Sequence, residues 1–212
     1  GRGGFGKGSG GMDPELAPNN GLLGVAALNV SNSTQVLEGR WTKIGTRKQD
    51  EAMRKLGLSR VFRRAANLLS GLEIKSSSSR FQVVSKGPLA VSIVEEYPMD
   101  GRVVTHSRRD KRSGPHRGRL KSVTPGSATI EVSWGEPHGG YLLETFRLNP
   151  DNPNVLEVIS DIRVDKDAVT GEKNPPFFRY SVEYERASGS SHGAQSQLQS
   201  QSQSQSQEPS NE

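Results

Sequence analysis

The pattern of hydrophobic and polar residues changes near Leu72. Beyond it, short stretches of alternating apolar and polar residues are separated by clusters of Gly, Pro, Asn, Asp and Ser. One stretch carries Ile130, Val132 and Trp134 at every second position. Because side chains of a strand alternate between its two faces, this period of two predicts half-buried strands joined by turns. The predicted strands are Leu72–Ser76, Arg80–Ser85, Leu89–Tyr97, Arg102–Ser107, Gly118–Val123, Ala128–Trp134, Tyr141–Leu148, Val155–Val164 and Phe177–Arg186.

The segment before these strands begins with one more strand, Leu37–Lys43, and then changes to a helical spacing. We expect Thr46 to act as the N-cap of a first helix and Gly57 to end it. Ser59 is the expected N-cap of a second helix. The apolar positions are Ala52, Met53 and Leu56 in the first helix, and Val61, Phe62, Ala65, Ala66, Leu68 and Leu69 in the second.

The order of these elements predicts an all-β fold. Ten strands are enough to close an antiparallel sheet into a barrel, which removes its exposed edges. A barrel of this width keeps a hollow interior that its own side chains do not fill. We therefore expect a ten-stranded antiparallel up-and-down barrel with a two-helix lid after the first strand. The apolar side of the second helix is expected to pack onto the barrel mouth.

The two ends of the chain differ in composition from the rest. Residues 1–34 contain a glycine-rich tract, and residues 188–212 contain a run of alternating Ser and Gln. Such sequences bury too little apolar surface to offset the entropy lost on ordering. We predict a disordered or processed segment over residues 1–34, a barrel over residues 35–187, and a disordered Ser/Gln-rich tail over residues 188–212.

Three short motifs carry a family resemblance. The first spans the junction of the first strand and the first helix, the second surrounds a predicted hairpin, and the third ends the last strand. Their residues are Gly39, Trp41, Asp50, Glu51, Met53, Leu56 and Gly57, then Glu95, Glu96, Asp100, Gly101 and Arg102, and finally Tyr184, Glu185 and Arg186. On these motifs the chain resembles the intracellular fatty-acid-binding proteins, which belong to the lipocalin-like, or calycin, group.

The resemblance implies binding and intracellular transport of a small hydrophobic ligand, a fatty acid or another lipid, in the barrel cavity. It also implies that Trp41 closes one end of the barrel. The family grips the ligand carboxylate with the final Tyr and with an Arg two residues before it, but this chain has Val182 at that position. Arg147 is a candidate to replace the missing Arg. The expected ligand-binding residues are Met53, Phe62, Tyr180, Val182, Tyr184 and Arg147.

Basic residues form the largest charged features of the sequence. The formal net charge is +5, and seven Lys or Arg residues fall between Arg108 and Lys121. Such a run is typical of a solvated loop. Arg60, Arg63 and Arg64 share one face of the second helix, which predicts transient contact with anionic membrane surfaces. Aromatic residues make up only 6% of the chain and do not interleave with the basic run, so we expect no nucleic-acid partner.

Few residues indicate catalysis or metal binding. The chain has no cysteine, and its four histidines lack the spacing of a metal site. His116 and His138 lie in predicted loops and are expected to be solvated. No nucleophile-elbow, phosphate-loop or zinc-protease pattern occurs. We therefore expect no enzyme activity, no cofactor and no metal.

Two other classes of function stay open at this point. One is a lipocalin-like barrel that binds haem or acts as an enzyme, with His106 or an interior tyrosine carrying the chemistry. The other is an interaction module with a vestigial cavity. A cytoplasmic monomer is the expected state, and organelle targeting by a missing or cleaved N-terminal segment is kept as an alternative.

Overall fold

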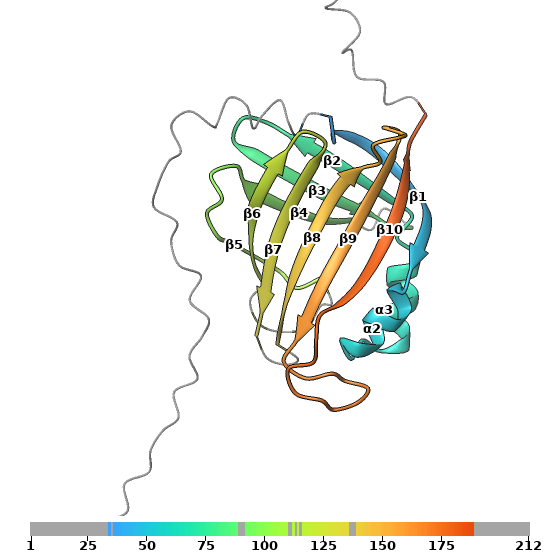
Figure 1. Cartoon of the computed structure of the whole chain (residues 1–212), viewed down its shortest axis with the longest axis vertical. Coiled ribbons are helices and arrows are strands. Elements are labelled where there is room, and N and C mark those ends of the chain that lie inside the picture. Colours follow the sequence, from blue (N-terminus) through green and yellow to red (C-terminus); the bar gives the residue numbers. More distant parts are fainter. Residues whose placement is uncertain are drawn as a thin grey trace, which may run out of the picture.

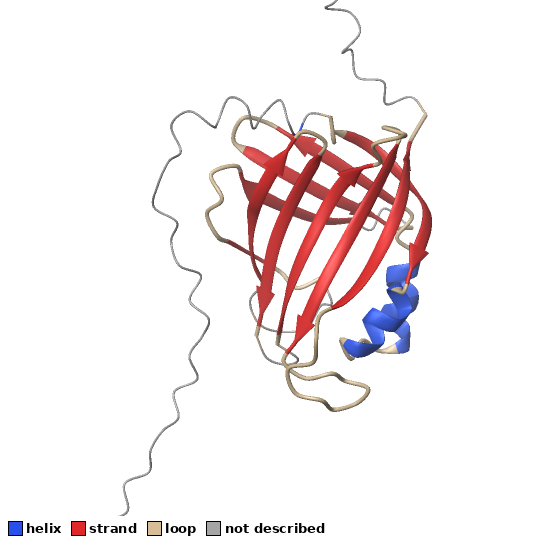
Figure 2. Ribbon diagram, viewed as in Figure 1, coloured by secondary structure: helices blue, strands red, loops and turns tan. Residues whose placement is uncertain are grey.

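The computed structural model describes residues 34, 36–88, 92–109, 112, 114, 116–135 and 139–188. In it, ten antiparallel strands form one sheet that curls into a nearly closed barrel, and two helices follow the first strand (Figure 1, Figure 2). The elements are β1 (Gly39–Arg47), α2 (Gln49–Lys55), α3 (Arg60–Asn67), β2 (Gly71–Ser76), β3 (Arg80–Lys86), β4 (Ser92–Pro98), β5 (Val104–His106), β6 (His116–Thr124), β7 (Ser127–Trp134), β8 (Gly140–Leu148), β9 (Val155–Val164) and β10 (Phe178–Arg186). The predicted fold class is confirmed. Of the two expected disordered ends, only Thr34 and Ser188 lie within the described residues.

The strand order around the barrel follows the chain, apart from the pairing of the first strand with the last. Neighbouring strands run β4-β3-β2-β1-β10-β9-β8-β7-β6-β5. Among the described residues, β4 and β5 share no ladder pair. We call this open edge between β4 and β5 the seam, and side chains rather than backbone hydrogen bonds close it.

The core confirms the alternation read from the sequence. Inward positions of the strands hold a continuous apolar cluster that includes Phe81, Ile130 and Phe146, each with at most 1% of its surface exposed. Trp41 joins this cluster with 1% exposure. Its indole Nε1 donates to the carbonyl of Leu37 at 3.0 Å, so this buried polar atom is satisfied.

The junction of β1 and α2 differs from the prediction. Thr46 lies inside β1, so it is not the N-cap. That position belongs to Lys48, which adopts a left-handed conformation with φ 58° and makes no side-chain cap. The left-handed residue turns the chain sharply from strand to helix. The predicted stop at Gly57 is confirmed: with φ 69° it ends α2, and the amide of Leu58 donates to the carbonyl of Met53 at 3.0 Å.

The second helix has its predicted N-cap but not its predicted packing. The hydroxyl of Ser59 accepts from the amide of Phe62. No residue of α3 is buried, and Val61, Phe62 and Leu68 are 75%, 43% and 59% exposed. The expectation that α3 packs its apolar side onto the barrel is therefore wrong. Arg63 instead attaches α3 to α2, with its Nε 3.1 Å from Asp50 Oδ1.

The connection between β9 and β10 is a structured hairpin at the same end of the barrel as the helices (Figure 1). Asp167 is buried, and its carboxylate accepts from the amides of Val169 and Thr170. The amide of Ala168, also in the hairpin, donates to the carbonyl of Lys55 at the end of α2, at 3.0 Å. This hairpin thus holds the C-terminal end of α2 against the barrel.

Candidate functional site

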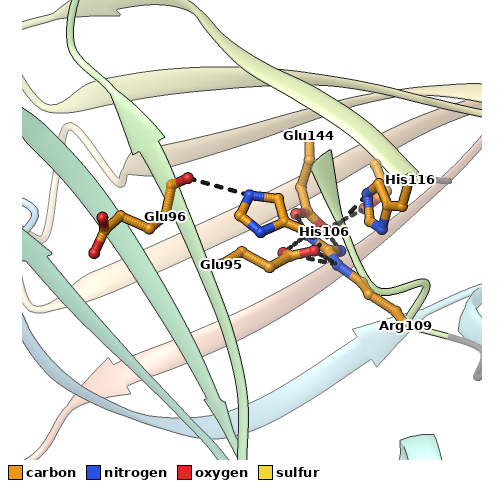
Figure 3. Close-up of polar contacts among 7 residues, drawn as sticks. Glu95, Glu96, His106, Arg109, His116 and Glu144 are labelled. Carbon is orange, nitrogen blue, oxygen red and sulfur yellow. Dashed lines mark hydrogen bonds and ion pairs between the residues drawn. The ribbon is translucent and has the colours of Figure 1, made fainter. Parts of the chain in front are cut away.

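A charged cluster lies inside the barrel. The guanidinium of Arg109, from the segment between β5 and β6, lies between the carboxylates of Glu95 on β4 and Glu144 on β8 (Figure 3). Its Nε donates to both oxygens of Glu95 at 2.9 Å, and its NH1 and NH2 donate to Glu144 at 3.0 and 2.7 Å. Both carboxylates are almost fully buried, at 3% and 5% exposure. This cluster connects the seam to the opposite wall.

The alternation of the strands explains why two polar side chains, those of Glu144 and Ser160, point inward. Glu144 lies between Leu142 and Phe146 in the period-two pattern of β8, and both of these neighbours belong to the core. Ser160 has the same relation to its neighbours in β9, and its hydroxyl donates to Glu144 at 3.3 Å. A polar residue at an inward strand position is unusual because burial without partners is costly, so such residues are candidates for function.

Aromatic and histidine rings close the seam beside this cluster. Tyr97 on β4 contacts His106 on β5 at 5.3 Å between ring centroids, and His106 contacts His116 on β6 at 6.3 Å. His106 Nε2 lies 3.1 Å from the carbonyl oxygen of Glu96, across the seam (Figure 3). Gly118 on β6 makes room for this arrangement, because a Cβ there would approach the ring of Tyr97 to 2.7 Å.

Burial and the charged pair together set the protonation of the cluster. Burial acts to raise the pKa of Glu95, but the charge and hydrogen bonds of Arg109 outweigh it and hold that pKa below its ordinary value. Burial, followed by the charge of Arg109, lowers the pKa of His116. Burial also raises the pKa of Tyr97, Tyr180 and Tyr184, and nearby glutamates add to the increase. Glu95 is therefore ionised beside Arg109, and the three tyrosines are neutral.

The lowered pKa of His116 gives a pH-dependent stability. In the unfolded chain His116 takes up a proton below about pH 6.5, before the folded protein does, so stability falls as the pH drops below that value. We expect His116→Gln to reduce the loss of unfolding free energy between pH 7 and pH 5.5, measured by urea unfolding at several pH values. An identical loss in variant and wild type would contradict the buried, neutral state of His116.

Two buried polar atoms in this region have no hydrogen-bond partner among the described residues. They are the hydroxyl of Tyr97 and Nε2 of His116, and the latter lies 3.8 Å from Glu95 Oε1. Tyr97 is fully buried and His116 is 4% exposed. A buried polar group without a partner costs roughly 1–3 kcal/mol. A donor or acceptor supplied by water or a ligand would satisfy both atoms.

A small cavity adjoins the cluster. Its volume is about 40 Å³, and its walls combine Arg109, Glu144 and Tyr184 with apolar side chains. The apolar part of the wall consists of Leu72, Val83, Phe146 and Val158. Pockets for small molecules are usually about 300–1,000 Å³, so this space holds a head group or a few waters rather than a whole lipid.

The structure brings only some of the predicted ligand residues together. Tyr184 lines the cavity, and Tyr180 and Val182 lie on the same strand, where Val182 is 5% exposed. Met53 is buried in α2, whereas Phe62 on α3 is largely exposed. None of these observations tests ligand contact, so these five residues stay predictions. The sixth, Arg147, lies elsewhere.

Arg147 lies on the outer surface of the barrel. Its side chain is 54% exposed, and its NH2 pairs with Glu157 Oε2 at 2.7 Å. The alternation of β8 explains this position, because Glu144 and Phe146 point inward and Arg147 therefore points outward. Arg109, which the sequence pattern did not single out, is a basic residue that lies inside the barrel.

The basic segment after β5 is only partly solvated, which corrects the prediction of a solvated loop. Arg108 is 5% exposed and donates to the carbonyl of Gly135. Arg109 enters the barrel, and Arg112 donates to the carbonyls at the end of α2, Leu56 and Gly57, at 3.1 and 2.6 Å. His116, expected in a loop, begins β6 and is buried. His138 and His192 lie outside the described residues.

A second hollow shares no lining residue with the small cavity. It has a volume of about 250 Å³ and is bounded by α2 and the start of β10. Its wall includes Lys55, whose ammonium lies 5.4 Å from the centre of the Phe178 ring. In the described part of the chain, no helix is long and apolar enough to cross a bilayer, and no three acidic or histidine side chains are arranged to hold a metal ion.

The fold is similar to that of solved lipid-binding proteins. Caenorhabditis elegans lipid binding protein 8 superposes with a TM-score of 0.54 over 73% of this chain and 98% of its own, at 14% identity. A Schistosoma mansoni fatty acid binding protein, in complex with arachidonic acid, gives 0.54 over 74% and 99%, at 13% identity. A REP1-NXSQ fatty acid transporter gives 0.51 over 71% and 96%, at 15% identity. No family model and no curated protein matches the chain. At these identities the similarity establishes the fold alone.

Proposed function

We propose that the protein binds a small hydrophobic ligand inside its barrel and carries it. The observation that supports this is a polar cluster placed within an otherwise apolar interior, with tyrosines and a cavity beside it. Ligand sites are mostly apolar with a few converging polar groups that fix orientation. The solved structures of the same fold are described as lipid-binding or fatty-acid-binding proteins, which agrees with this interpretation.

Binding a long chain requires the interior to open. The cavity of about 40 Å³ is too small for an alkyl chain, and the side chain of Arg109 forms part of its wall. Outward movement of Arg109 would leave room beside Glu144 and Tyr184, and the apolar wall would then receive the chain.

A cavity-filling substitution tests this proposal. We expect Ser85→Phe, which adds bulk to the cavity wall, to weaken binding of a 12-carbon chain at least tenfold. Ser133→Phe is the matched control, because Ser133 alternates with the inward-facing Val132 and Trp134 and so lies on the outer face of β7. Binding is measured by calorimetric titration. Equal affinities for both variants would contradict a ligand site in the interior.

The small cavity favours one second candidate, an interaction module with a filled core. In that case neither variant nor wild type binds any 12-carbon chain, whatever its head group. The haem or enzyme alternative gains no support from His106, whose Nε2 is close to the carbonyl of Glu96. A cytoplasmic location and a monomeric state stay predictions.

The helices suggest how a carrier would meet a membrane. We propose that α3 contacts anionic lipid, because it exposes Val61 and Phe62 together with Arg60 and Arg64. Each basic residue near such a surface contributes about 1 kcal/mol. Arg63 was also predicted to contact the membrane. Its side chain donates hydrogen bonds to Asp50 on α2 and to the carbonyl of Leu58, so it also links the two helices.

Substituting Arg60 and Arg64 tests this contact. We expect Arg60→Ser with Arg64→Ser to slow transfer of a bound ligand to anionic vesicles several-fold and to leave transfer to neutral vesicles unchanged. Salt should slow the wild-type transfer, because screening shortens the reach of the charges. Arg147→Ser, a surface arginine on β8, is the control. Rates that are insensitive to both lipid charge and salt would exclude membrane docking through α3.

A further inference from the structure

The interior cluster has an excess of negative charge. It holds one guanidinium, that of Arg109, against the two carboxylates of Glu95 and Glu144. His116 adds no positive charge, because burial and Arg109 lower its pKa. In formal charges the cluster carries −1. A buried charge without full compensation is unfavourable, so the site favours a further positive charge over a negative one.

Arg109 has little capacity left to hold an anion. A guanidinium has five N–H donors. Its Nε–H is shared between the two oxygens of Glu95, NH1 donates once to Glu144, and NH2 donates to both glutamates. At most one N–H is then left over among the described residues. A ligand carboxylate cannot form a paired bidentate contact with one donor, and it would approach two existing carboxylates.

The unpartnered atoms beside Glu95 can take part in binding an added donor. Nε2 of His116 lies 3.8 Å from a carboxylate oxygen of Glu95, and neither this nitrogen nor the hydroxyl of Tyr97 has a hydrogen-bond partner among the described residues. A neutral imidazole accepts at one nitrogen, and a neutral hydroxyl both donates and accepts. A donor placed beside Glu95 therefore meets acceptors on the carboxylate and on the neighbouring side chains.

We propose that the ligand carries a protonated amine head group, which the carboxylates of Glu95 and Glu144 bind alongside or in place of Arg109. This inference rests on the proposed function and names the class of its ligand. An ammonium has three donors and no acceptor, which suits a cluster with two carboxylates around one guanidinium. It is close to water in size and fits the cavity beside Glu144, whose remaining wall of Leu72, Val83, Phe146 and Val158 receives the apolar chain.

The experiment compares three ligands with the same 12-carbon chain in the full-length wild-type protein. Dodecylamine, dodecanol and dodecanoic acid are titrated at pH 7 by calorimetry, below their micelle concentrations. We expect dodecylamine to bind at least tenfold more tightly than dodecanoic acid, with dodecanol between them. The net charge of +5 disfavours nonspecific binding of the amine. Equal or tighter binding of the acid overturns the amine proposal alone, and binding of none of the three overturns the proposed function with it.

Variants assign the preference to the cluster. We expect Glu144→Gln to weaken the binding of dodecylamine at least tenfold. The affinity for dodecanol should stay within threefold of the wild-type value. Glu157→Gln is the matched control, because Glu157 pairs with Arg147 on the outer face. Circular dichroism checks that each variant is folded. An unchanged amine affinity in folded Glu144→Gln overturns the proposal. If that variant does not fold, the order of the three wild-type affinities still decides.

Discussion

Arg109→Met is expected to lower the free energy of unfolding by about 3–5 kcal/mol, the usual cost of removing one partner from a buried ion pair. The guanidinium is the shared partner of two carboxylates that are 3% and 5% exposed. Without it, Glu95 and Glu144 are buried with like charges near each other. Urea unfolding followed by circular dichroism measures the change.

A surface arginine provides the matched control. Arg147→Met also removes a guanidinium that pairs with a glutamate. The side chains of Arg147 and Glu157 are 54% and 28% exposed, and exposed ion pairs contribute only about 0.2–1 kcal/mol to stability. Adding Glu95→Gln and Glu144→Gln to Arg109→Met should recover part of the loss, because the unpaired charges are then absent. A loss for Arg109→Met no larger than that for Arg147→Met would show that Arg109 does not lie between the glutamates.

Trp41→Ala is expected to cost about 3–5 kcal/mol, the range for deleting a large buried aromatic side chain. Trp41 is 1% exposed, packs in the main core cluster and donates its indole N–H to Leu37. The guanidinium of Arg186 lies 4.1 Å from the centre of its ring, which adds a cation–π contact between the first and last strands. The variant therefore loses core volume and weakens the junction of β1 and β10.

Trp41→Phe separates these contributions. It retains most of the apolar volume and the aromatic face, and loses the N–H donor to Leu37, so its cost should be well below that of Trp41→Ala. Trp134 is the remaining tryptophan in both variants, and its fluorescence then reports unfolding of β7. A cost below about 1 kcal/mol for Trp41→Ala would contradict full burial, because core truncations of this size cost more.

The fold was predictable because its strands and helix ends are specified by residues close together in the sequence. Alternation of apolar and polar residues located all nine strands after the helices, and β9 has the predicted bounds Val155–Val164. Gly57 and Ser59 act at the helix ends through their own backbone and side-chain chemistry. The predicted start of the first helix at Thr46 was wrong. The N-cap is Lys48, which adopts a left-handed conformation that is not expected for a lysine.

Part of the candidate site also had a signal in the sequence. Glu144 occupies an inward position between Leu142 and Phe146, and Ser160 occupies one between Val158 and Ile162. Polar residues at apolar positions of a period-two pattern are detectable, although the sequence interpretation did not use them. Arg147 is the converse case, since the same pattern places it outside.

The sequence by itself determined which residues face the core, because the strand period of two and the turn residues act within a few positions of one another. Only the tertiary structure decided what that core does. Arg109 lies in a segment without periodicity, 14 residues after Glu95 and 35 before Glu144. Closure of the barrel brings these three residues together, and the opening between β4 and β5 places Tyr97 beside His106. Charge pairing across the interior joins residues that are distant in sequence, so no local sequence pattern predicts it.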